Sequence, residues 1–360
     1  MSRTKRTRRD TDRPDIHAVA RLAKVSIATV SRTINNVATV DPKLAQRVWK
    51  AIETLGYSPN SQARALVSGR SRLLGLIISE ITNPFFPELI QGFEDVAVEN
   101  GYEILISSTN YDPQRMETCI QRMLERKVDG VAVMTFGIEA PLLDRLAQRK
   151  IPLVFVDVSP KGPLFSTIEV DYYHGIREAV QHLAVLGHRR IGFISGPLHL
   201  HSAGERRNAF LRAVEEVGIT PDPAWLREGD HTLEGGIAVM QRILGCPQLP
   251  TAIMASNDMT AIGVLHALYK TGARVPEDFS VIGFDDVNFA QFTLPPLTSV
   301  QMSRLSLARC AVMALRDHLD PQQRGAAPRY KVQTRLTVRQ STGLPPGSLQ
   351  DRGNGRSGRK

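Results

Sequence analysis

Residues 26–35, SIATVSRTIN, combine small, hydroxyl and basic side chains in an arrangement that suits contact with DNA. If the segment is a helix capped by Ser26, Val30 and Ile34 face inward together with Val25 of the preceding turn. The outward face then carries Ile27, Ala28, Thr29, Ser31 and Arg32. Small side chains let a helix approach the floor of the major groove, hydroxyl groups reach phosphates, and arginine pairs bidentately with guanine. The segment therefore favours a DNA-recognition helix.

Two further short helices are expected around this segment. Apolar residues recur at helical spacing from Ile16 to Ala23, and Asp15 can cap the first turn, so residues 15–36 form two helices with a tight break. A third helix begins at Asp41, which is followed by proline at the first helical position. The inner face of this third helix, which ends near Gly56, carries Leu44, Val48, Ile52 and Leu55.

The basic residues of the chain are concentrated in the same region. Residues 1–72 hold 15 Lys and Arg against 5 Asp and Glu, a net charge of +10, whereas the remaining residues hold 30 against 31. Most runs of charged residues are explained simply as part of the solvent-exposed surface. Here the basic segment coincides with the three predicted helices, which indicates a DNA-binding head on an almost neutral body.

The composition also excludes several classes of protein. The chain has no apolar run of 18 residues, which argues against a membrane span, and its basic N-terminus lacks the apolar segment of a secretory signal. Its three cysteines have neither a disulfide framework nor metal-ligand spacing. We therefore expect reduced thiols, a cytoplasmic protein associated with the nucleoid, and neither a metal nor a cofactor.

From Leu73 onward the pattern changes to apolar strands that alternate with amphipathic helices. Strands are expected at 73–79, 102–108, 128–134, 151–157, 189–195, 250–256, 278–285, 297–301 and 331–342. Helices are expected at 84–101, 113–126, 140–149, 171–187, 202–217, 233–244, 258–271 and 303–319. This alternation predicts two similar α/β subdomains with parallel sheets covered on both faces. The glycine-rich motifs of dinucleotide and phosphate sites do not follow these strands, which argues against an enzyme. His182 and His188, near the helix end at 187, are expected to be capping or surface residues.

The string VARLAKVSIATVSRTIN at 19–35 resembles the helix-turn-helix of the lactose-repressor (LacI/GalR) family. Similar family strings are NPFF at 83–86, DGV at 129–131, LGHRRIGFISGP at 186–197, SND at 256–258, VPEDFSVIGFDD at 275–286 and PPLTSV at 295–300. The resemblance spans about residues 15–342. It implies a small all-α helix-turn-helix head and an α/β core like a type I periplasmic binding protein, with two parallel-sheet subdomains. Lys24 departs from the family, which has glycine there; a left-handed backbone would cost lysine about 1 kcal/mol.

The resemblance implies a division of the chain. It begins with a basic disordered arm (1–13), a helix-turn-helix domain (14–58) and a hinge helix (59–71), and ends with a disordered tail (343–360). Between them lies an effector-binding and dimerisation core (72–342), with an N-subdomain at about 72–160 and 298–320 and a C-subdomain at about 161–297 and 321–342. In the hinge, Leu66 matches the family's minor-groove wedge and Ala63 precedes it by one turn; the alternative is a flexible linker.

Several of the predicted strands end in polar residues, and ligands bind at the carboxyl ends of parallel strands. These ends are Ser79, Asp157, Asn257-Asp258 and Asp285, although Asp258 and Ser79 can also be read as helix caps. By resemblance, the effector is held by Asp157, Arg206, Asn257 and Asp285. More variable pocket positions match Ser79, Val170, His231 and Met302, of which His231 could stack on a sugar or be a surface residue. Carboxylates and a guanidinium suit vicinal hydroxyls, so a monosaccharide or glycoside is favoured, and a purine-like ligand stays open.

These expectations combine into a homodimeric transcription regulator, a repressor of operator DNA controlled by an effector between two subdomains. Ile27, Ala28 and Arg32 would read bases, and Leu66 would enter the minor groove with Ala63 beside it. The phosphate-binding positions would be Ser26, Thr29, Ser31, Asn35, Tyr57 and Asn60. The alternatives are a corepressor-dependent purine-type repressor and a sugar-binding solute receptor; the second would need a secretory signal.

Overall fold

The computed structural model describes residues 14–35, 37, 39–58, 69–135, 151–158, 164–320 and 330–346. By its contacts the chain separates into two units, residues 1–71 and 72–360, which are described individually. Several predictions lie outside the described residues: the basic arm, the helix at 140–149, the tail beyond 346, and the hinge positions Asn60, Ala63 and Leu66.

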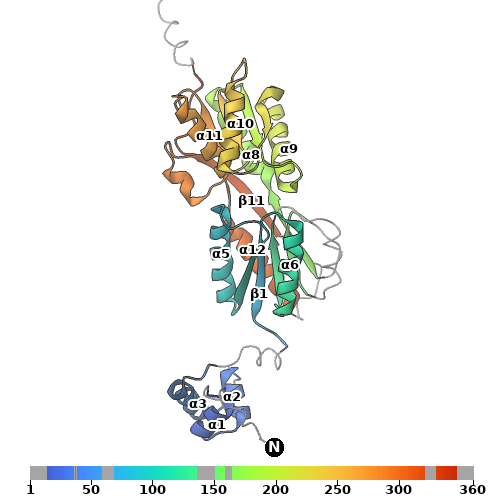
Figure 1. The fold of residues 1–360 in the computed structure, drawn as a ribbon, viewed down its shortest axis with the longest axis vertical. Helices are drawn as coiled ribbons and strands as arrows, with labels where there is room; N and C mark the ends of the chain where they lie inside the picture. Colours follow the sequence, from blue (N-terminus) through green and yellow to red (C-terminus); the bar gives the residue numbers. More distant parts are fainter. Residues whose placement is uncertain are drawn as a thin grey trace, which may run out of the picture. The chain divides into compact units, whose positions relative to one another are not determined.

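The described part of the first unit, which we call the head, contains three helices, α1 (Ile16–Ala23), α2 (Ile27–Ile34) and α3 (Pro42–Leu55) (Figure 1). All three predicted N-caps are confirmed, because the side chains of Asp15, Ser26 and Asp41 accept hydrogen bonds from the first turn of their helices. Val30 is fully buried, as predicted. The inner face of α2 also includes Thr33, which the sequence analysis left out; its hydroxyl donates to the Thr29 carbonyl and so needs no water.

The turn between α1 and α2 contains a lysine in a left-handed backbone conformation. Lys24 has φ 53° and ψ 48°, the conformation that favours glycine. The Arg47 guanidinium of α3 donates to the carbonyl oxygens of Ala23 and Lys24 and so fastens the turn to the rest of the head. The cost that the sequence predicted at this position is therefore present, and Arg47 offsets part of it.

We expect Lys24→Gly to stabilise the head by about 1 kcal/mol, because glycine adopts this backbone without strain. Hydrogen exchange of the α1 and α2 amides in the full chain should then slow by about fivefold, since 1.4 kcal/mol is a factor of ten. Lys43→Gly, in the first turn of α3, is the control and should not slow exchange. Unchanged or faster exchange in Lys24→Gly would contradict the strain argument.

The second unit, which we call the core, contains eleven strands among its described residues. They are β1 (Leu73–Ile78), β2 (Glu103–Ser108), β3 (Gly130–Met134), β4 (Leu153–Val156), β5 (Phe165–Asp171), β6 (Ile191–Ser195), β7 (Leu226–Glu228), β8 (Ala252–Ala255), β9 (Ser280–Asp285), β10 (Thr298–Met302) and β11 (Tyr330–Thr337). Their order is β2-β1-β3-β4-β5-β11-β10-β9-β8-β6-β7. The pairing is parallel except between β10 and β11.

Helices cover both faces of this sheet (Figure 1). Where the structure describes the core, its α-helices are α5 (Phe85–Glu99), α6 (Pro113–Glu125), α8 (Tyr172–Leu186), α9 (His201–Glu216), α10 (Leu233–Leu244), α11 (Asp258–Lys270) and α12 (Arg304–Leu319). Short 3-10 helices are η1 (Pro223–Trp225) and η2 (Asn288–Phe292). Alternate residues of β3 pack on opposite sides, Ala132 with the cluster beneath α5 and α12 and Val131 with the cluster beneath α6. The expected α/β core is therefore present, and its sheet is mostly parallel.

The two halves of the core are joined through β11. We call β1–β5 with α5, α6 and α12 the N-terminal half, and β6–β10 with α8–α11 the C-terminal half. The first part of β11, residues 330–333, pairs with β5, and the second part, residues 334–337, pairs with β10. The two predicted sheets thus continue into one another through a single shared strand.

Strand pairing differs from the division expected at residues 160 and 298. β5 was not predicted as a strand, and it pairs with β4 of the N-terminal half, whereas β10 pairs with β9 of the C-terminal half. β7 was also missed, because three residues are too few to show a period. For β5, pairing with its neighbours rather than the local pattern decides that the segment is a strand.

Two further expectations about the C-terminal half were wrong. His188 is fully buried instead of lying on the surface, and its ring bonds the hydroxyls of Thr251 and Ser280. The chain also stays in contact with the core beyond Thr342, because Gly343 bonds to both His188 and Ser280. His182 bonds Thr342 in the same region. These contacts fasten the segment that follows β11, at Thr342 and Gly343, to the rest of the core.

Among the described residues, no helix combines the length and apolarity needed to cross a bilayer.

Candidate functional site

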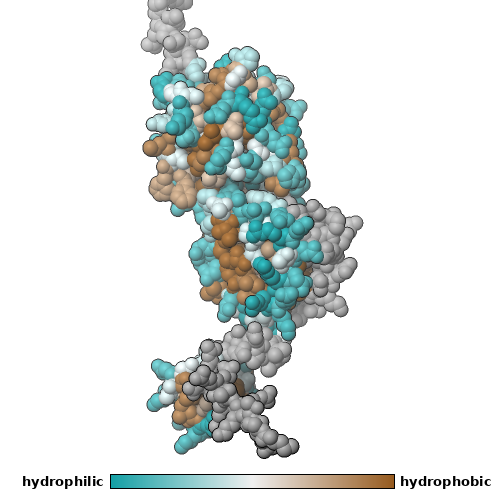
Figure 2. All heavy atoms as spheres, in the orientation of Figure 1, coloured by the Kyte–Doolittle hydropathy of each residue, from teal (hydrophilic) through white to brown (hydrophobic). Residues whose placement is uncertain are grey.

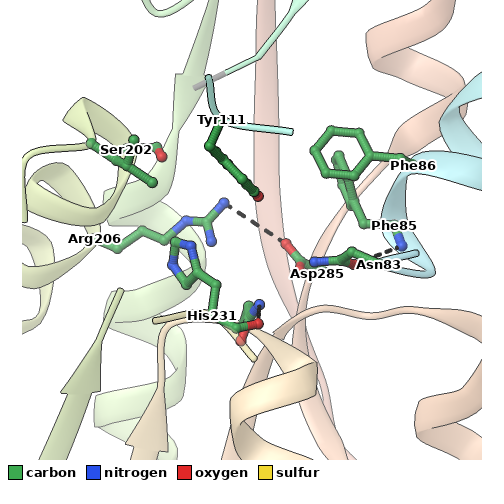
Figure 3. A pocket seen from close by; sticks show the side chains of 10 residues that line it. Asn83, Phe85, Phe86, Tyr111, Ser202, Arg206, His231 and Asp285 are labelled. Atoms are coloured by element: carbon green, nitrogen blue, oxygen red, sulfur yellow. Dashed lines mark hydrogen bonds and ion pairs between the residues drawn. The ribbon is translucent and has the colours of Figure 1, made fainter. Parts of the chain in front are cut away.

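A pocket lies between the two halves of the core, near the carboxyl ends of several strands (Figure 3). It is lined by Asn83, Phe85, Phe86, Tyr111, Leu200, Ser202, Arg206, His231, Asn257 and Asp285. Its free volume is about 20 Å³, which is room for one water-sized molecule. The side chains themselves fill the site, so a larger ligand requires that the halves or the side chains move apart.

Arg206 and Asp285 form the charged centre of the pocket. Arg206 projects from α9 and is 3% exposed, and its Nη2 lies 3.8 Å from Asp285 Oδ1 (Figure 3). Nη1 donates to the Ser256 carbonyl at 2.6 Å. The guanidinium carbon Cζ also lies 4.1 Å from the centre of the Phe284 ring and 5.1 Å from that of the Tyr172 ring. A planar cation held on two aromatic rings is fixed in orientation and can pair with acceptors bidentately.

Asp285 ends β9 in a backbone conformation that is unusual for a residue other than glycine. Its φ is 108°, and the next residue, Asp286, has φ 55°. Burial raises the pKa of Asp285 to about 6, while the charges of Arg206 and Arg304 oppose that rise. A carboxyl group that titrates so close to neutrality can accept hydrogen bonds from ligand hydroxyls and changes its charge under mild conditions.

Asn257 and His231 form the floor of the pocket on the C-terminal side. Asn257 caps α11, since its Oδ1 accepts from the Thr260 amide, and its Nδ2 donates to the His231 carbonyl. His231 Nε2 lies 3.0 Å from Ser256 Oγ, and the ring packs where a side chain at Gly196 would otherwise sit. Burial and the charge of Arg206 lower the pKa of His231 to about 3, so the ring is neutral. Of the two interpretations offered by the sequence, the structure contradicts a surface imidazole.

The opposite wall is aromatic and comes from the N-terminal half. Phe85 and Phe86 begin α5 and meet edge to face, 5.3 Å apart, and Tyr111 points from the loop after β2 toward Arg206 and Asp285 (Figure 3). Burial raises the pKa of Tyr111. None of these three residues was predicted from the sequence. The NPFF string and the position of Tyr111 after a strand end were the available signals.

Four of the predicted effector residues line the pocket, namely Arg206, His231, Asn257 and Asp285. Asp157 does not, because both of its carboxylate oxygens are engaged within the protein, by the Val170 amide at 2.8 Å and the Tyr172 hydroxyl at 2.6 Å. Ser79, Val170 and Met302 are buried and do not line the pocket either.

Asp258 is not the helix cap that the sequence suggested. That role falls to Asn257, and Asp258 is fully buried in the first turn of α11. It accepts hydrogen bonds from the Val287 amide and the Ser299 hydroxyl, and burial raises its pKa well above the ordinary value. It therefore fastens the loop after β9 to α11 rather than facing a ligand.

The predicted DNA-binding residues of the head differ in exposure. Ile27, Ala28 and Arg32 of α2 are exposed, as is Asn35 just after it. Thr29 and Ser31 of α2 are half-buried, as is Tyr57 after α3. The Ser26 hydroxyl accepts from the Thr29 amide and lies 2.9 Å from the Thr29 hydroxyl, so both groups take part in the helix cap. An open groove beside α2 is lined by His17, Ala20, Arg21, Lys24, Val25, Ser26 and Ile27. The basic residues of this groove, His17 and Arg21 of α1 and Lys24 of the turn, were not among the predicted DNA-binding residues. A helical wheel of α1 would have indicated them.

The opposite pKa shifts of His231 and Asp285 predict a measurable pH dependence of stability. Between pH 6.5 and 4 the unfolded chain gains a proton at His231 that the folded chain does not accept, so stability falls with falling pH. The folded chain gains a proton at Asp285 near pH 6, before the unfolded chain does, and this opposes the fall.

We therefore expect His231→Gln to gain stability relative to the wild type as the pH falls from 6.5 to 4, and Asp285→Asn to lose it. The free energy of unfolding of each variant, relative to that of the wild type, should change by up to about 1.4 kcal/mol per pH unit. This applies between pH 6.5 and 4 for His231→Gln and from about pH 6 down to 4 for Asp285→Asn. Denaturant unfolding at several pH values measures both, with the exposed His266→Gln as control. Parallel pH profiles for all variants would rule out the shifts.

Two family models match the chain. The model described as "Bacterial regulatory proteins, lacI family" matches residues 15–60, and the model described as "Periplasmic binding protein-like domain" matches residues 180–342. The first match coincides with the three helices of the head, and the second lies within the core.

Relatives and solved structures align over nearly the whole chain. The HTH-type transcriptional repressor PurR of Haemophilus influenzae (strain PittEE) is 34% identical over 91% of this chain and 98% of its own. The repressor CytR of Escherichia coli (strain K12) is 34% identical over 91% and 96%. A lac repressor dimer bound to operator and the anti-inducer ONPF superposes with a TM-score of 0.82 at 27% identity, covering 92% of this chain and 99% of that one. A CelR–cellobiose complex gives 0.68 at 30% identity, covering 91% and 100%.

Proposed function

The chain belongs to the LacI family of bacterial transcriptional regulators, and from that premise we propose that it represses genes by binding operator DNA until a small effector in the core pocket changes its affinity. It is a DNA-binding regulator with an effector domain, and its relatives PurR, CytR and the lac repressor are repressors, not enzymes. The observation that carries the effector part is the buried Arg206–Asp285 pair, which faces a pocket built by both halves. A ligand there would set how the halves close.

For the DNA part, we propose that α2 enters the major groove. Arg32 and the small Ala28 are exposed on it, and Ile27 is 41% exposed at its start, which supports base contact by these three side chains. The half-buried Thr29, Ser31 and Tyr57, together with Ser26 and Asn35, would contact phosphates. The basic groove beside α2 extends that surface. Asn60, Ala63 and Leu66 keep their proposed role at the hinge on the family resemblance alone.

The proposed effector is a sugar or glycoside. A carboxylate and a guanidinium aligned around a small space bind vicinal hydroxyls, and an aromatic wall suits the apolar face of a sugar ring. The printed description of one structural relative names cellobiose. The same aromatic wall also favours a second candidate, a purine-type corepressor, because Phe85, Phe86 and Tyr111 could contact a planar base.

We propose that the core forms a homodimer. Figure 2 shows an apolar band on the face of the N-terminal half where α5 lies, and exposed apolar side chains of α5 and α12 include Val98, Leu305 and Met313. A lac repressor dimer is among the structural relatives. Exposed apolar surface of this kind is typical of an interface between subunits. Sedimentation at micromolar concentration should give a dimer, and a tetramer or monomer would refute it.

A thermal-shift screen of the full chain tests the effector assignment. Monosaccharides, glycosides such as cellobiose, and purines and nucleosides are each added in excess; at 100 times its dissociation constant a ligand adds about 2.7 kcal/mol of stability. We expect a sugar to raise the melting temperature of the core. A purine that does so instead would select the second candidate, and no shift from either class would count against this use of the pocket.

A further inference from the structure

Behind the pocket, Arg304 joins the two halves of the core. It is the first residue of α12 in the N-terminal half, and its guanidinium donates to the carbonyl oxygens of Asp285 and Asp286 at the end of β9, the latter at 2.8 Å. Nη2 also lies 2.9 Å from Oε2 of Glu88 on α5. The Arg304 side chain is 14% exposed, so these contacts are shielded from solvent. One guanidinium therefore contacts α5 and the end of β9 at once.

Glu88 strengthens the same connection from the other side. Its second oxygen, Oε1, accepts a hydrogen bond of 2.9 Å from the backbone amide of Asn288. Both members of the ion pair thus bond to the backbone between residues 285 and 288. We call Arg304, Glu88 and this backbone segment the Arg304 clamp.

The segment held by the clamp has an unusual backbone conformation. Asp285 and Asp286 are consecutive residues with positive φ, a conformation that is unfavourable for residues other than glycine and needs support from its surroundings. Their carboxylates point to different partners. That of Asp285 lies 3.8 Å from Arg206 in the pocket, and that of Asp286 accepts from Gln301 at 2.9 Å and pairs with Arg339 at 2.6 Å. A small rotation of this turn would move the Asp285 carboxylate away from Arg206.

The position of Arg304 in its helix is itself unfavourable. A cation in the first turn of a helix faces the positive end of the helix dipole, whereas Glu88 in the first turn of α5 has the favourable sign. Helix stability alone therefore does not explain an arginine at this place. The contacts to the two carbonyls and to Glu88 do.

We propose that Arg304 is a positioning residue for the effector pocket: it holds the left-handed turn that presents Asp285 to Arg206, and through Glu88 it makes that geometry depend on α5. Movement of α5 relative to the C-terminal half would then change the pocket, and occupation of the pocket would act on α5. The inference rests on the proposed function only where it concerns the effector.

Hydrogen exchange of the full chain tests the clamp without any ligand. The variants are Arg304→Met, which keeps the aliphatic stem, and the milder Glu88→Gln; Arg274→Met is the matched control, because Arg274 is exposed and pairs with Asp278 four residues away. We expect exchange in residues 286–292 to quicken at least tenfold in Arg304→Met and measurably in Glu88→Gln, although Glu88 lies on a different element. The control should match the wild type. Unchanged exchange in both clamp variants would overturn the proposal.

Cellobiose and adenosine serve as probes for the positioning role. Whichever of them raises the melting temperature of the wild type should bind Arg304→Met at least tenfold more weakly. Arg304→Lys should be intermediate, because lysine keeps the charge but is shorter and lacks the planar fork that spans both carbonyls and Glu88. Faster exchange with unchanged probe affinity would show a structural contact and overturn the positioning role. If neither probe affects the wild type, the proposed effector class fails, while the exchange result still decides the clamp.

Discussion

Replacing Arg206 by methionine should weaken effector binding by at least about 30-fold, because truncating one member of a buried, hydrogen-bonded charge pair costs about 2–5 kcal/mol. Methionine keeps much of the volume over Phe284 but provides no donors. The same change removes the cation that faces Asp285 and that lowers its pKa from an even higher value. Without Arg206 the pKa of this carboxyl group should therefore rise further, so that the group takes up its proton at a higher pH than in the wild type.

The measurement is calorimetric titration of the full chain with the compound that shifts the wild type most in the thermal screen. Arg212→Met is a matched control on the same helix, because Arg212 is 65% exposed and pairs with Glu216 at the surface. It should bind the compound like the wild type. If Arg206→Met bound equally well, the ligand would have to lie elsewhere, and the assignment of Asp285 and Asn257 to the effector would fail with it.

The second large effect concerns the packing of α10 against α11. Gly263 of α11 faces the first turn of α10 so closely that a methyl group added there would collide with the Leu233 carbonyl and lie 2.9 Å from the Ile237 amide. These are backbone atoms, which cannot rotate away. Gly236 on α10 meets the Thr260 carbonyl in the same manner. The two helices can approach at this distance only with glycine at both positions.

We expect Gly263→Ala to lower the free energy of unfolding by about 3 kcal/mol, at the upper end of the usual range for overpacking. The melting temperature of the core should fall by roughly 6–12 °C, since 1 kcal/mol corresponds to about 2–4 °C in a domain of this size. Gly204→Ala is the matched control, because Gly204 also lies within a helix but has no neighbouring atom within 4 Å of the added methyl group. It should be neutral or stabilising by up to about 1 kcal/mol. Equal melting temperatures for the two variants would mean that the helices separate without cost.

Most of the fold could be predicted from the sequence because its elements are marked locally. The caps at Asp15, Ser26 and Asp41 have a short-range cause, and so do the apolar strands and the glycine that ends α8 at Gly187. The missed strands β5 and β7 lack such marks. β5 becomes a strand because β4 and β11 lie on either side of it, and that contact involves residues far apart in the chain.

The pocket could be predicted only in part, for a related reason. Arg206, His231, Asn257 and Asp285 were found through strand ends or family resemblance, and all four belong to the C-terminal half. The aromatic wall belongs to the N-terminal half and faces the pocket only after the two halves have assembled. Asp157 shows the opposite error: a carboxylate at a strand end looks available in a sequence, but its hydrogen bonds to Val170 and Tyr172 depend on the fold.

The shared strand β11 also decides when this protein can finish folding during its synthesis. β5 ends at Asp171, but the strand that completes its outer edge begins only at Tyr330. At ~5–20 residues per second, a ribosome needs on the order of 10–30 s to make the intervening ~160 residues. During that interval the edge of β5 can pair with other chains, as exposed strand edges do. The N-terminal half is therefore the part of the nascent chain that most needs protection from aggregation. A chain truncated before Tyr330 lacks β11, so that neither β5 nor β10 has this strand as its neighbour.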